Sequence, residues 1–255
     1  MITRAHITRR AATDDVPART VERDYVLAHI IAGLASLERD TGLVFKGGTA
    51  LRFCHFEDYR YSADLDFSIV AGSREDAYAT IEEALTATGG TTEGLRLTDH
   101  APRKIVYVGP LKRERTLKLD LADDELVLNV EARALLPRWE DLPADVTLPV
   151  YTLPEIAGEK IRCILQRVQC RDLFDLSVLL TEGDVDVIDA ADIFRSKAEH
   201  RGTDPNVFAA RYPERLNQYR QRWDAELQEH VHGDVPHFDQ LERAVSRELR
   251  SAGLL

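Results

Sequence analysis

The sequence predicts an α+β protein in which a strand-rich first part is followed by a helical second part. Up to Glu131, short alternating apolar segments are separated by glycine, proline and charged turns, as is typical of strands. From Leu153 onward, apolar residues recur mostly at helical spacing. We therefore expect a mixed sheet flanked by helices over residues 1–150, joined near residues 141–152 to a helical domain over residues 151–255.

The individual elements follow from the same two periodicities. Helices are expected over residues 21–38 and from an N-cap at Ser73 to Thr88, before Gly89 and Gly90. Two further helices are expected near residues 211–229 and 238–250, where they could bind a partner, form a dimer or pack on the core. Strands are expected at residues 44–45, 64–70, 95–99, 104–108, 116–121 and 126–131.

Composition permits a soluble enzyme. With 255 residues, 44% of them hydrophobic, the chain can bury one large core or two modest ones. No run approaches the ~18 apolar residues of a spanning helix, and the first residues lack the apolar stretch of a signal peptide. We therefore expect a cytoplasmic protein that does not bind membranes. Cys54, Cys163 and Cys170 show no C-x-x-C spacing, so we expect buried or inert thiols rather than disulfides or a zinc site.

A glycine pair marks the first candidate site. Gly47 and Gly48 stand between a short apolar strand and a helix whose first turn includes Thr49. Without Cβ atoms they allow a ligand close to the backbone, and the N–H groups that begin a helix attract phosphate oxygens. Lys46 would add a full positive charge. The alternative is an ordinary tight turn.

An acidic pair follows one helix later. Asp64 and Asp66 belong to an alternating strand, which sends residues i and i+2 to the same face, and Ser62 extends the row. Two neighbouring carboxylates repel each other unless a cation lies between them, and Mg²⁺ is usually held by one or two carboxylates with substrate phosphates. A second such pair, Asp184 and Asp186, has no glycine turn nearby and is most simply a loop or a helix start.

A third carboxylate is available on a later strand. Lys118 and Asp120 again occupy positions i and i+2, so Asp120 completes a metal site if its strand lies beside Asp64 and Asp66. The alternative is an exposed strand face with paired charges. Other carboxylates that could serve are Asp123, Asp124 and Glu131.

Basic residues concentrate in one stretch, although the formal net charge of the chain is −11. Between residues 96 and 118, seven basic residues face two acids, a local charge of about +5 that would guide a polyanion to a neighbouring site. A solvent-facing hairpin rich in arginine explains the stretch equally well. The seven are Arg96, Arg103, Lys104, Lys112, Arg113, Arg115 and Lys118.

The helical part opens with a charged stripe. If one helix runs through it, Lys160, Arg167 and Arg171 share a face and can reach a common anion. Asp172 and Asp175 would hold that stripe in place. These charges interrupt an otherwise apolar sequence, which favours a constrained polar cluster over a solvated helix face.

Four motifs in a fixed order carry a family resemblance. KGGTAL, RYSADLDF, LKLDL and EKIRCILQRVQCRDLFDL, spread over residues 44–180, resemble the AbiEii/AbiGii toxin family of nucleotidyltransferases, which includes the MenT-type toxins of mycobacteria. The resemblance implies a DNA polymerase β-like nucleotidyltransferase core with a helical companion domain. It also implies the toxin of a type IV toxin–antitoxin or abortive-infection system, which transfers NMP from NTP to the tRNA 3′ end and blocks aminoacylation and translation.

The resemblance implies roles for single residues and for ligands. The catalytic residues would be Ser62, Asp64, Asp66, Lys160 and Asp172. The nucleotide would be bound by Lys46, Gly47, Gly48, Thr49, Ser62, Lys160 and Arg167. Metal would be held by Asp64, Asp66 and Asp120. Arg60 and Arg171 match the family pattern too, although internal salt bridges would explain both. Two Mg²⁺ ions, with Mn²⁺ as a substitute, would act on an NTP substrate, with tRNA as the acceptor and a cognate antitoxin as a partner. Independently of the resemblance, we expect a monomer.

Two other functions fit the same core. One is nucleotidyl or phosphoryl transfer to a protein or a small molecule, and the other is a non-catalytic binding role. Charge reversal at Lys112, Arg113 and Arg115 separates RNA activity from a small-molecule reaction, because only RNA activity needs the basic stretch.

Overall fold

The structure is a computed structural model that describes residues 2–37, 39–88 and 93–255. These residues divide into two compact units. The first contains residues up to 124 together with 131–150 and 229–233, and the second contains 125–130, 151–228 and the residues from 234 onward. No helix in the described part of the chain is both long enough and apolar enough to cross a membrane.

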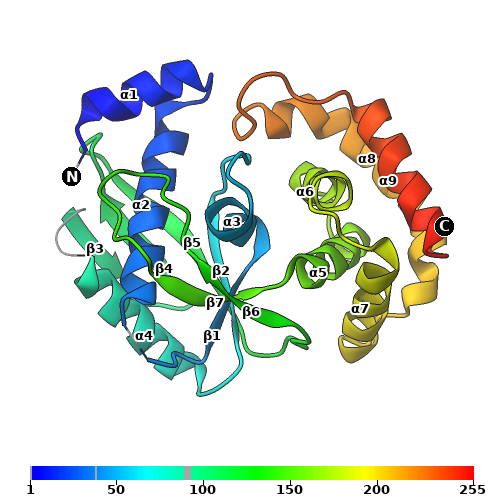
Figure 1. Cartoon of the computed structure of the whole chain (residues 1–255), viewed down its shortest axis with the longest axis horizontal. Coiled ribbons are helices and arrows are strands. Elements are labelled where there is room, and N and C mark those ends of the chain that lie inside the picture. Colours follow the sequence, from blue (N-terminus) through cyan, green and yellow to red (C-terminus); the bar gives the residue numbers. More distant parts are fainter. Residues whose placement is uncertain (1, 38, 89–92) are drawn as a thin grey trace. The chain divides into compact units, whose positions relative to one another are not determined.

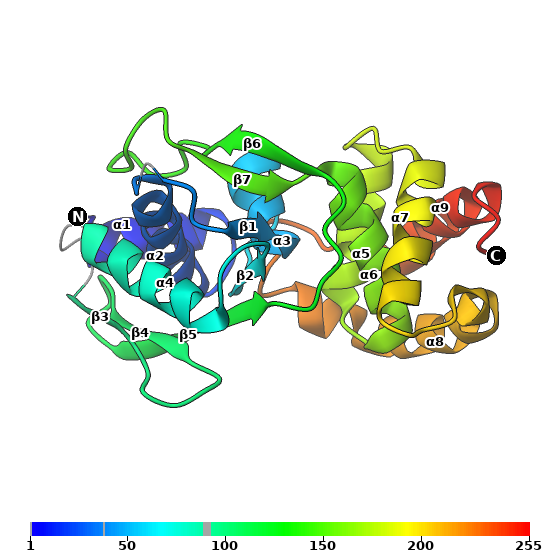
Figure 2. The same cartoon turned by 90° about the horizontal axis from the view of Figure 1, so that it is seen from below.

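The strands of the described residues form one mixed seven-stranded sheet, in the order β3-β4-β5-β2-β1-β7-β6 (Figures 1 and 2). Strand β1 is antiparallel to β2 and parallel to β7, while β2 is parallel to β5, which is antiparallel to β4. The strands are β1 Leu43–Lys46, β2 Asp64–Ile69, β3 Glu93–Leu97, β4 Lys104–Val108, β5 Glu114–Ala122, β6 Val130–Ala134 and β7 Thr147–Tyr151.

The helices of the first unit are α1 Arg4–Thr13, α2 Ala18–Ala35, α3 Gly47–Ala50, which continues as a π-helical turn over Leu51–His55, and α4 Arg74–Ala87. Helices α2 and α4 pack against each other (Figure 1). The predicted helix over residues 21–38 begins earlier and ends at Ala35, and Glu38 lies outside the described residues. Ser73 caps α4 as predicted, because its side chain accepts a hydrogen bond from the Asp76 N–H. Gly89 and Gly90 also lie outside the described residues.

The two faces of the sheet differ in chemistry. Leu65 pairs with Leu119 and Phe67 with Leu121 across β2 and β5, and all four side chains are buried. Helix α2 covers this apolar face, where its Glu22 carboxylate lies 3.1 Å from the Arg115 guanidinium of β5. Because side chains alternate along a strand, the opposite face carries the acidic residues of β2 and β5.

Two predictions about the junction between sheet and helices are wrong in part. The strand predicted over residues 126–131 begins only at Val130, because the N–H groups of Leu128 and Asn129 donate to the Glu155 carboxylate, at 3.1 and 3.2 Å, rather than to a strand. The segment predicted as a junction, residues 141–152, contains β7. Its Val150 is buried and is the register partner of Phe45 on β1.

The second unit is helical. It contains α5 Leu153–Gln166, α6 Cys170–Thr181, α7 Val187–His200, a 3₁₀ turn at Pro205–Val207, α8 Phe208–Leu227 and α9 Phe238–Ser251. Helix α5 packs closely on α7 at Gly158, where a Cβ atom would lie 2.5 Å from Ile193. A continuous helix through Arg171 is wrong: α5 ends at Gln166, and Arg167 has extended backbone angles. Arg171 therefore belongs to α6, not to the Lys160 stripe.

Two smaller predictions are confirmed. Asp186 begins α7, because its carboxylate accepts a hydrogen bond from the Ile188 N–H at 2.8 Å. The three cysteines are free and buried, and burial raises the pKa of each thiol to about 12. None of the three is a reactive thiolate at neutral pH.

Candidate active site

The acidic face of β2 and β5 brings together the predicted metal-binding carboxylates. The two strands run in parallel with Asp64 opposite Lys118 and Asp66 opposite Asp120. Register partners in a sheet share a face, so Asp64, Asp66 and Asp120 all project to the same side. The strand adjacency on which the prediction for Asp120 depended is therefore present.

Asp66 is the most perturbed of these carboxylates. Burial, followed by the nearby charge of Asp64, raises its pKa to about 6 against the opposing charge of Lys46. Lys46 is buried and is the register partner of Asp66 across β1 and β2. A carboxyl group with a pKa near neutrality, beside a second carboxylate, marks a site that favours a cation.

Gly47 is required by the close approach of the backbone to Asp66. Its φ is +75°, a conformation that L side chains rarely adopt, and an added Cβ would lie 2.8 Å from Asp66 Oδ2. The sequence alone assigned this glycine to the approach of a ligand. The structure adds a second reason, since any larger residue would push the Asp66 carboxylate out of place.

Thr49 and Ser62 fasten the start of β2 to α3. Their hydroxyl oxygens are hydrogen-bonded at 2.7 Å, and the Thr49 hydroxyl also bonds the backbone carbonyl of Asp64. Both side chains are buried. These hydrogen bonds fix the backbone position of Asp64. A direct contact of either hydroxyl with nucleotide stays a prediction.

The third carboxylate is held by a lysine. Lys118 Nζ lies 3.1 Å from Asp120 Oδ2, and more than half of each side chain is exposed. Among the described residues, no group of three or more histidine, cysteine, aspartate or glutamate side chains is arranged to hold a metal ion. The crowded oxygens of Asp64 and Asp66 nevertheless suit a hard divalent cation such as Mg²⁺. The metal role of Asp64, Asp66 and Asp120 therefore remains a prediction.

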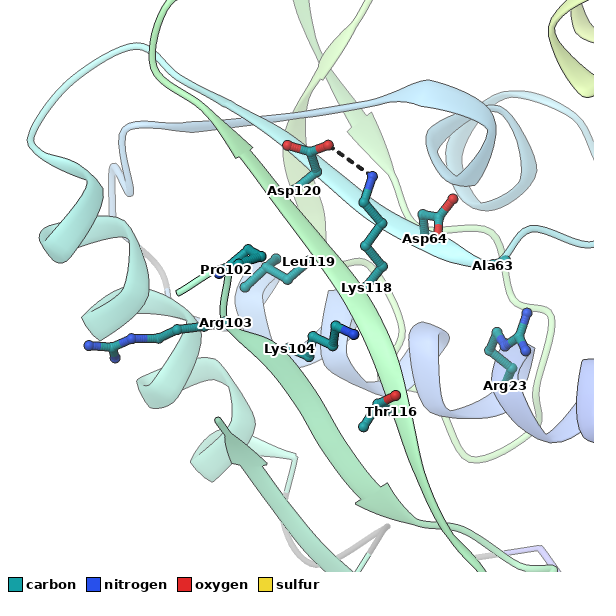
Figure 3. A pocket seen from close by; sticks show the side chains of 10 residues that line it. All are labelled: Arg23, Ala63, Asp64, Pro102, Arg103, Lys104, Thr116, Lys118, Leu119 and Asp120. Carbon is teal, nitrogen blue, oxygen red and sulfur yellow. Dashed lines mark hydrogen bonds and ion pairs between the residues drawn. The ribbon is translucent and has the colours of Figure 1, made fainter. Parts of the chain in front are cut away.

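A cavity of about 510 Å³ opens beside this acidic face (Figure 3). Asp64 and Asp120 lie on its wall, and Arg23 reaches it from α2 near Ala63. Its remaining lining residues are Pro102, Arg103, Lys104, Thr116, Lys118 and Leu119. The predicted acids thus border a space of the size that binds small ligands.

The lysine motif forms a separate cluster in the second unit. Lys160 Nζ lies 2.9 Å from Asp172 and 2.7 Å from Asp175, and Arg167 binds Asp172 at 2.8 Å. Burial alone would raise the pKa of Asp172, but the charge of Lys160 and the hydrogen bond from Arg167 outweigh it and hold the pKa below its usual value. The prediction that Asp172 and Asp175 hold the charged stripe is confirmed for Lys160 and Arg167, whereas Arg171 lies on α6 outside the stripe.

Comparison with known proteins decides the family. Residues 29–245 match the family described as nucleotidyl transferase AbiEii toxin, type IV TA system. The chain belongs to the AbiEii family. The structure also resembles that of MenT4, a nucleotidyltransferase toxin from Mycobacterium tuberculosis H37Rv, with a TM-score of 0.76 and 23% identity over 100% of this chain and 91% of that one. No curated protein matches the chain.

These findings confirm the predicted α+β nucleotidyltransferase fold and the toxin family. Members of the AbiEii family act as nucleotidyltransferase toxins in type IV toxin–antitoxin systems, so an antitoxin is the partner that membership implies. Nucleotidyltransferases as a class use an NTP and a divalent cation. The assignment of NTP-binding and cation-binding residues in this AbiEii protein is a proposal.

Sequence reasoning missed Arg23, which lines the cavity from α2. The available signal was the run Glu22-Arg23-Asp24 within a helix that is otherwise largely apolar. Glu22 and Asp24 are buried and bind Arg115 and Arg52, respectively. Their role in this AbiEii protein is to fasten α2 to the sheet and to the segment after α3.

Proposed function

We propose that this chain transfers NMP from an NTP to the 3′ end of RNA, with the tRNA acceptor end as its target and a block of aminoacylation and translation as its toxic effect. The observation that carries the proposal is the register of β2 and β5, which sets Asp64, Asp66 and Asp120 side by side in a chain of the AbiEii family. The tRNA target is supported by the motif resemblance and by the cationic residues around the cavity.

The proposed reaction is a displacement at phosphorus. The RNA 3′ oxygen forms a bond to the α-phosphorus, the bond from that phosphorus to the bridging oxygen breaks, and pyrophosphate leaves with the electron pair. The hydroxyl proton passes to a carboxylate of the site or to water. When bound, two Mg²⁺ ions, or Mn²⁺ in their place, would lower the pKa of the attacking hydroxyl and offset the charge of the phosphates.

The first-unit residues position this chemistry. Asp64 and Asp66 would hold the cations, and Asp120 would join them when released from Lys118. Lys46 and the Gly47-Gly48 turn would bind the triphosphate on the β1 side of the acids, with Thr49 and Ser62 holding the start of β2. Most of the rate enhancement then comes from placing two anionic substrates against fixed charges.

Lys160 and Arg167 are proposed as nucleotide-phosphate ligands on the family resemblance, with Asp172 as the residue that holds both. Lys160→Met should raise the KM for NTP. An unchanged KM together with a full rate would contradict this assignment. We further propose a cytoplasmic monomer that is neutralised by a cognate antitoxin.

The test is to incubate the purified protein with Mg²⁺, total bacterial tRNA and each labelled NTP in turn, with the Asp64→Ala variant as control. Label at the tRNA 3′ end that requires Asp64 supports the proposal and identifies the base. Pyrophosphate release with label on a protein or small molecule instead would replace RNA as the substrate. An absence of both label and pyrophosphate release with every NTP would contradict an enzymatic role.

A further inference from the structure

The cavity beside Asp64 is bordered by a row of cations in register. Lys104 on β4 is the partner of Lys118 on β5, and Lys118 is in turn the partner of Asp64 on β2. The three side chains therefore share one face, as the view into the cavity shows (Figure 3). Arg23, which is hydrogen-bonded to the Tyr107 side chain, adds a further cation where α2 borders the cavity.

Two lysines directly opposite each other are unfavourable for a sheet. Like charges at paired positions repel, and nothing in strand packing requires both. Lys118 is compensated by Asp120, 3.1 Å away. The Lys104 ammonium has no hydrogen-bond or ion-pair partner among residues 2–37, 39–88 and 93–255, and its side chain is exposed. The arrangement is explained if an anion binds between Lys104 and Asp64.

Other basic residues of the same stretch point their charges elsewhere. Arg103 lies 3.4 Å from Glu75 and stacks on Tyr78, Arg96 pairs with Glu114, and Arg115 is tied to Glu22. Arg103 lines the cavity, but its guanidinium points away from it towards α4 (Figure 3), and the charges of Arg96 and Arg115 are likewise compensated outside the cavity. Lys104 is thus the residue of this stretch whose charge is both uncompensated within the described residues and directed at the acidic face.

Strand order separates the two sides of the acidic face. In the order β4-β5-β2-β1, the aspartates of β2 lie between Lys46 and Gly47 on the β1 side and the cavity on the β5 and β4 side. A displacement reaction needs its attacking and leaving groups on opposite sides of the phosphorus. With the triphosphate on the β1 side, the cavity is the place from which the acceptor attacks.

We propose that this cavity binds the 3′-terminal strand of the RNA acceptor, with Lys104 and Arg23 contacting backbone phosphates beside Asp64. The inference rests on the proposed transfer to RNA and assigns the acceptor subsite of that reaction. A volume of about 510 Å³ falls within the range of sites that enclose a small ligand, which fits one nucleotide with its flanking phosphate. Positive charge here attracts the acceptor without base preference.

The test measures RNA binding separately from catalysis. The probe is a fluorescein-labelled RNA hairpin with a single-stranded end whose last nucleotide lacks the 3′ hydroxyl, titrated by anisotropy at several salt concentrations. Lys104→Met is compared with Arg113→Met, an exposed residue of the same basic stretch that does not line the cavity. Calorimetric titration with NTP and Mg²⁺ reports nucleotide binding, and thermal melting confirms the fold of each variant.

We expect Lys104→Met to weaken RNA binding several-fold and to reduce the slope of log affinity against log salt by about 0.7, with NTP affinity unchanged. Arg113→Met should change the affinity less. Equal effects of the two variants, no RNA binding by the unmodified protein, or a loss of NTP affinity in Lys104→Met would each overturn the inference. Failure of the proposed function gives a different result. In that case the unmodified protein adds no label to an RNA that carries a 3′ hydroxyl, whether or not it binds the probe.

Discussion

The acidic face of the sheet and the lysine cluster of the second unit handle buried charge in opposite ways. On β2, Asp66 is crowded by Asp64 and its pKa is raised to about 6, first by burial and then by that like charge. In the helical unit, Asp172 is fully buried, yet Lys160 and Arg167 hold its pKa below the usual value. One region concentrates like charge and the other balances it.

This difference indicates that the β2 carboxylates favour a bound cation, whereas the charges of the Lys160 cluster satisfy one another. Like charges crowded together at a partly buried position lower stability, so a fold retains them where another requirement outweighs the loss. A buried ion pair with good geometry satisfies its own charges and becomes costly to break. On this basis we propose the β2 carboxylates as the catalytic centre. The second-unit cluster joins α5 to α6 through its ion pairs, in addition to the nucleotide contact proposed for Lys160 and Arg167.

The largest expected effect is on catalysis at the acidic face. Asp64→Ala should reduce nucleotide transfer on the order of 10³-fold or more while the thermal midpoint changes little, because the residue acts on the transition state rather than on packing. The measurement is label transfer together with a melting curve. Asp123→Ala is the matched control, since Asp123 is exposed and pairs only with Arg74 among the described residues. Comparable losses in both variants would break the assignment.

The next effect is on stability in the second unit. Lys160→Met leaves two buried carboxylates without their shared cation and should reduce the free energy of unfolding by about 3–5 kcal/mol. Denaturant titration with hydrogen exchange in α5 and α6 measures this loss. Arg195→Met, which removes an exposed pair with Asp192 and a hydrogen bond to the Ala252 carbonyl in the same unit, should cost no more than about 1–2 kcal/mol. A loss of that small size for Lys160→Met would show that the cluster is not a structural joint.

A smaller effect is expected at the glycine turn. Gly47→Ala places a Cβ 2.8 Å from Asp66 Oδ2 at a φ of +75°, so transfer should fall about 10²-fold through displacement of the carboxylate. Gly233→Ala is a close control, because Gly233 has a φ of +74° with nothing within 4 Å. Both variants carry the same backbone cost, so the comparison of their rates isolates the contact with Asp66. Similar rates for the two variants would contradict that explanation.

Much of this organisation could be predicted from the sequence, where periodicity and local chemistry decide the outcome. The alternation around Asp64 and Asp66, the Ser73 cap and the Asp186 helix start depend on residues within a few positions of each other. The adjacency of Asp120 to Asp66 depends on strand order, which one sequence does not encode locally, so it could be stated only as a condition.

The failures have long-range causes. Residues 126–129 have a strand-like sequence, but the Glu155 carboxylate binds the backbone N–H groups of Leu128 and Asn129. No local sequence pattern predicts that contact. The Lys160 stripe was predicted on one helix, whereas Arg167 breaks the helix and still reaches Asp172 across the turn. The ion-pair partners of Arg103 and Arg115, which lie on α4 and α2, could not be predicted from local sequence either.

The most direct test replaces Asp66 by asparagine and follows the free energy of unfolding and label transfer in one preparation, with chelator present during unfolding. A folded-state pKa above the unfolded value means that ionised Asp66 destabilises the native state above pH 6, by at most about 3 kcal/mol. Asp66→Asn should therefore be more stable than the unmodified protein at pH 7.5 yet inactive. That gain should fade as the pH falls from 6 towards 4.

Asp172→Asn provides the opposite case for the same measurement. Because its pKa is lowered in the folded state, ionised Asp172 stabilises the protein above pH 4, so the asparagine variant should be less stable at pH 7.5 and the loss should shrink in acid. Opposite signs for the two variants, with transfer abolished in Asp66→Asn, are what this account predicts. A less stable Asp66→Asn, or one that still transfers label, would contradict the assignment of the catalytic centre to β2.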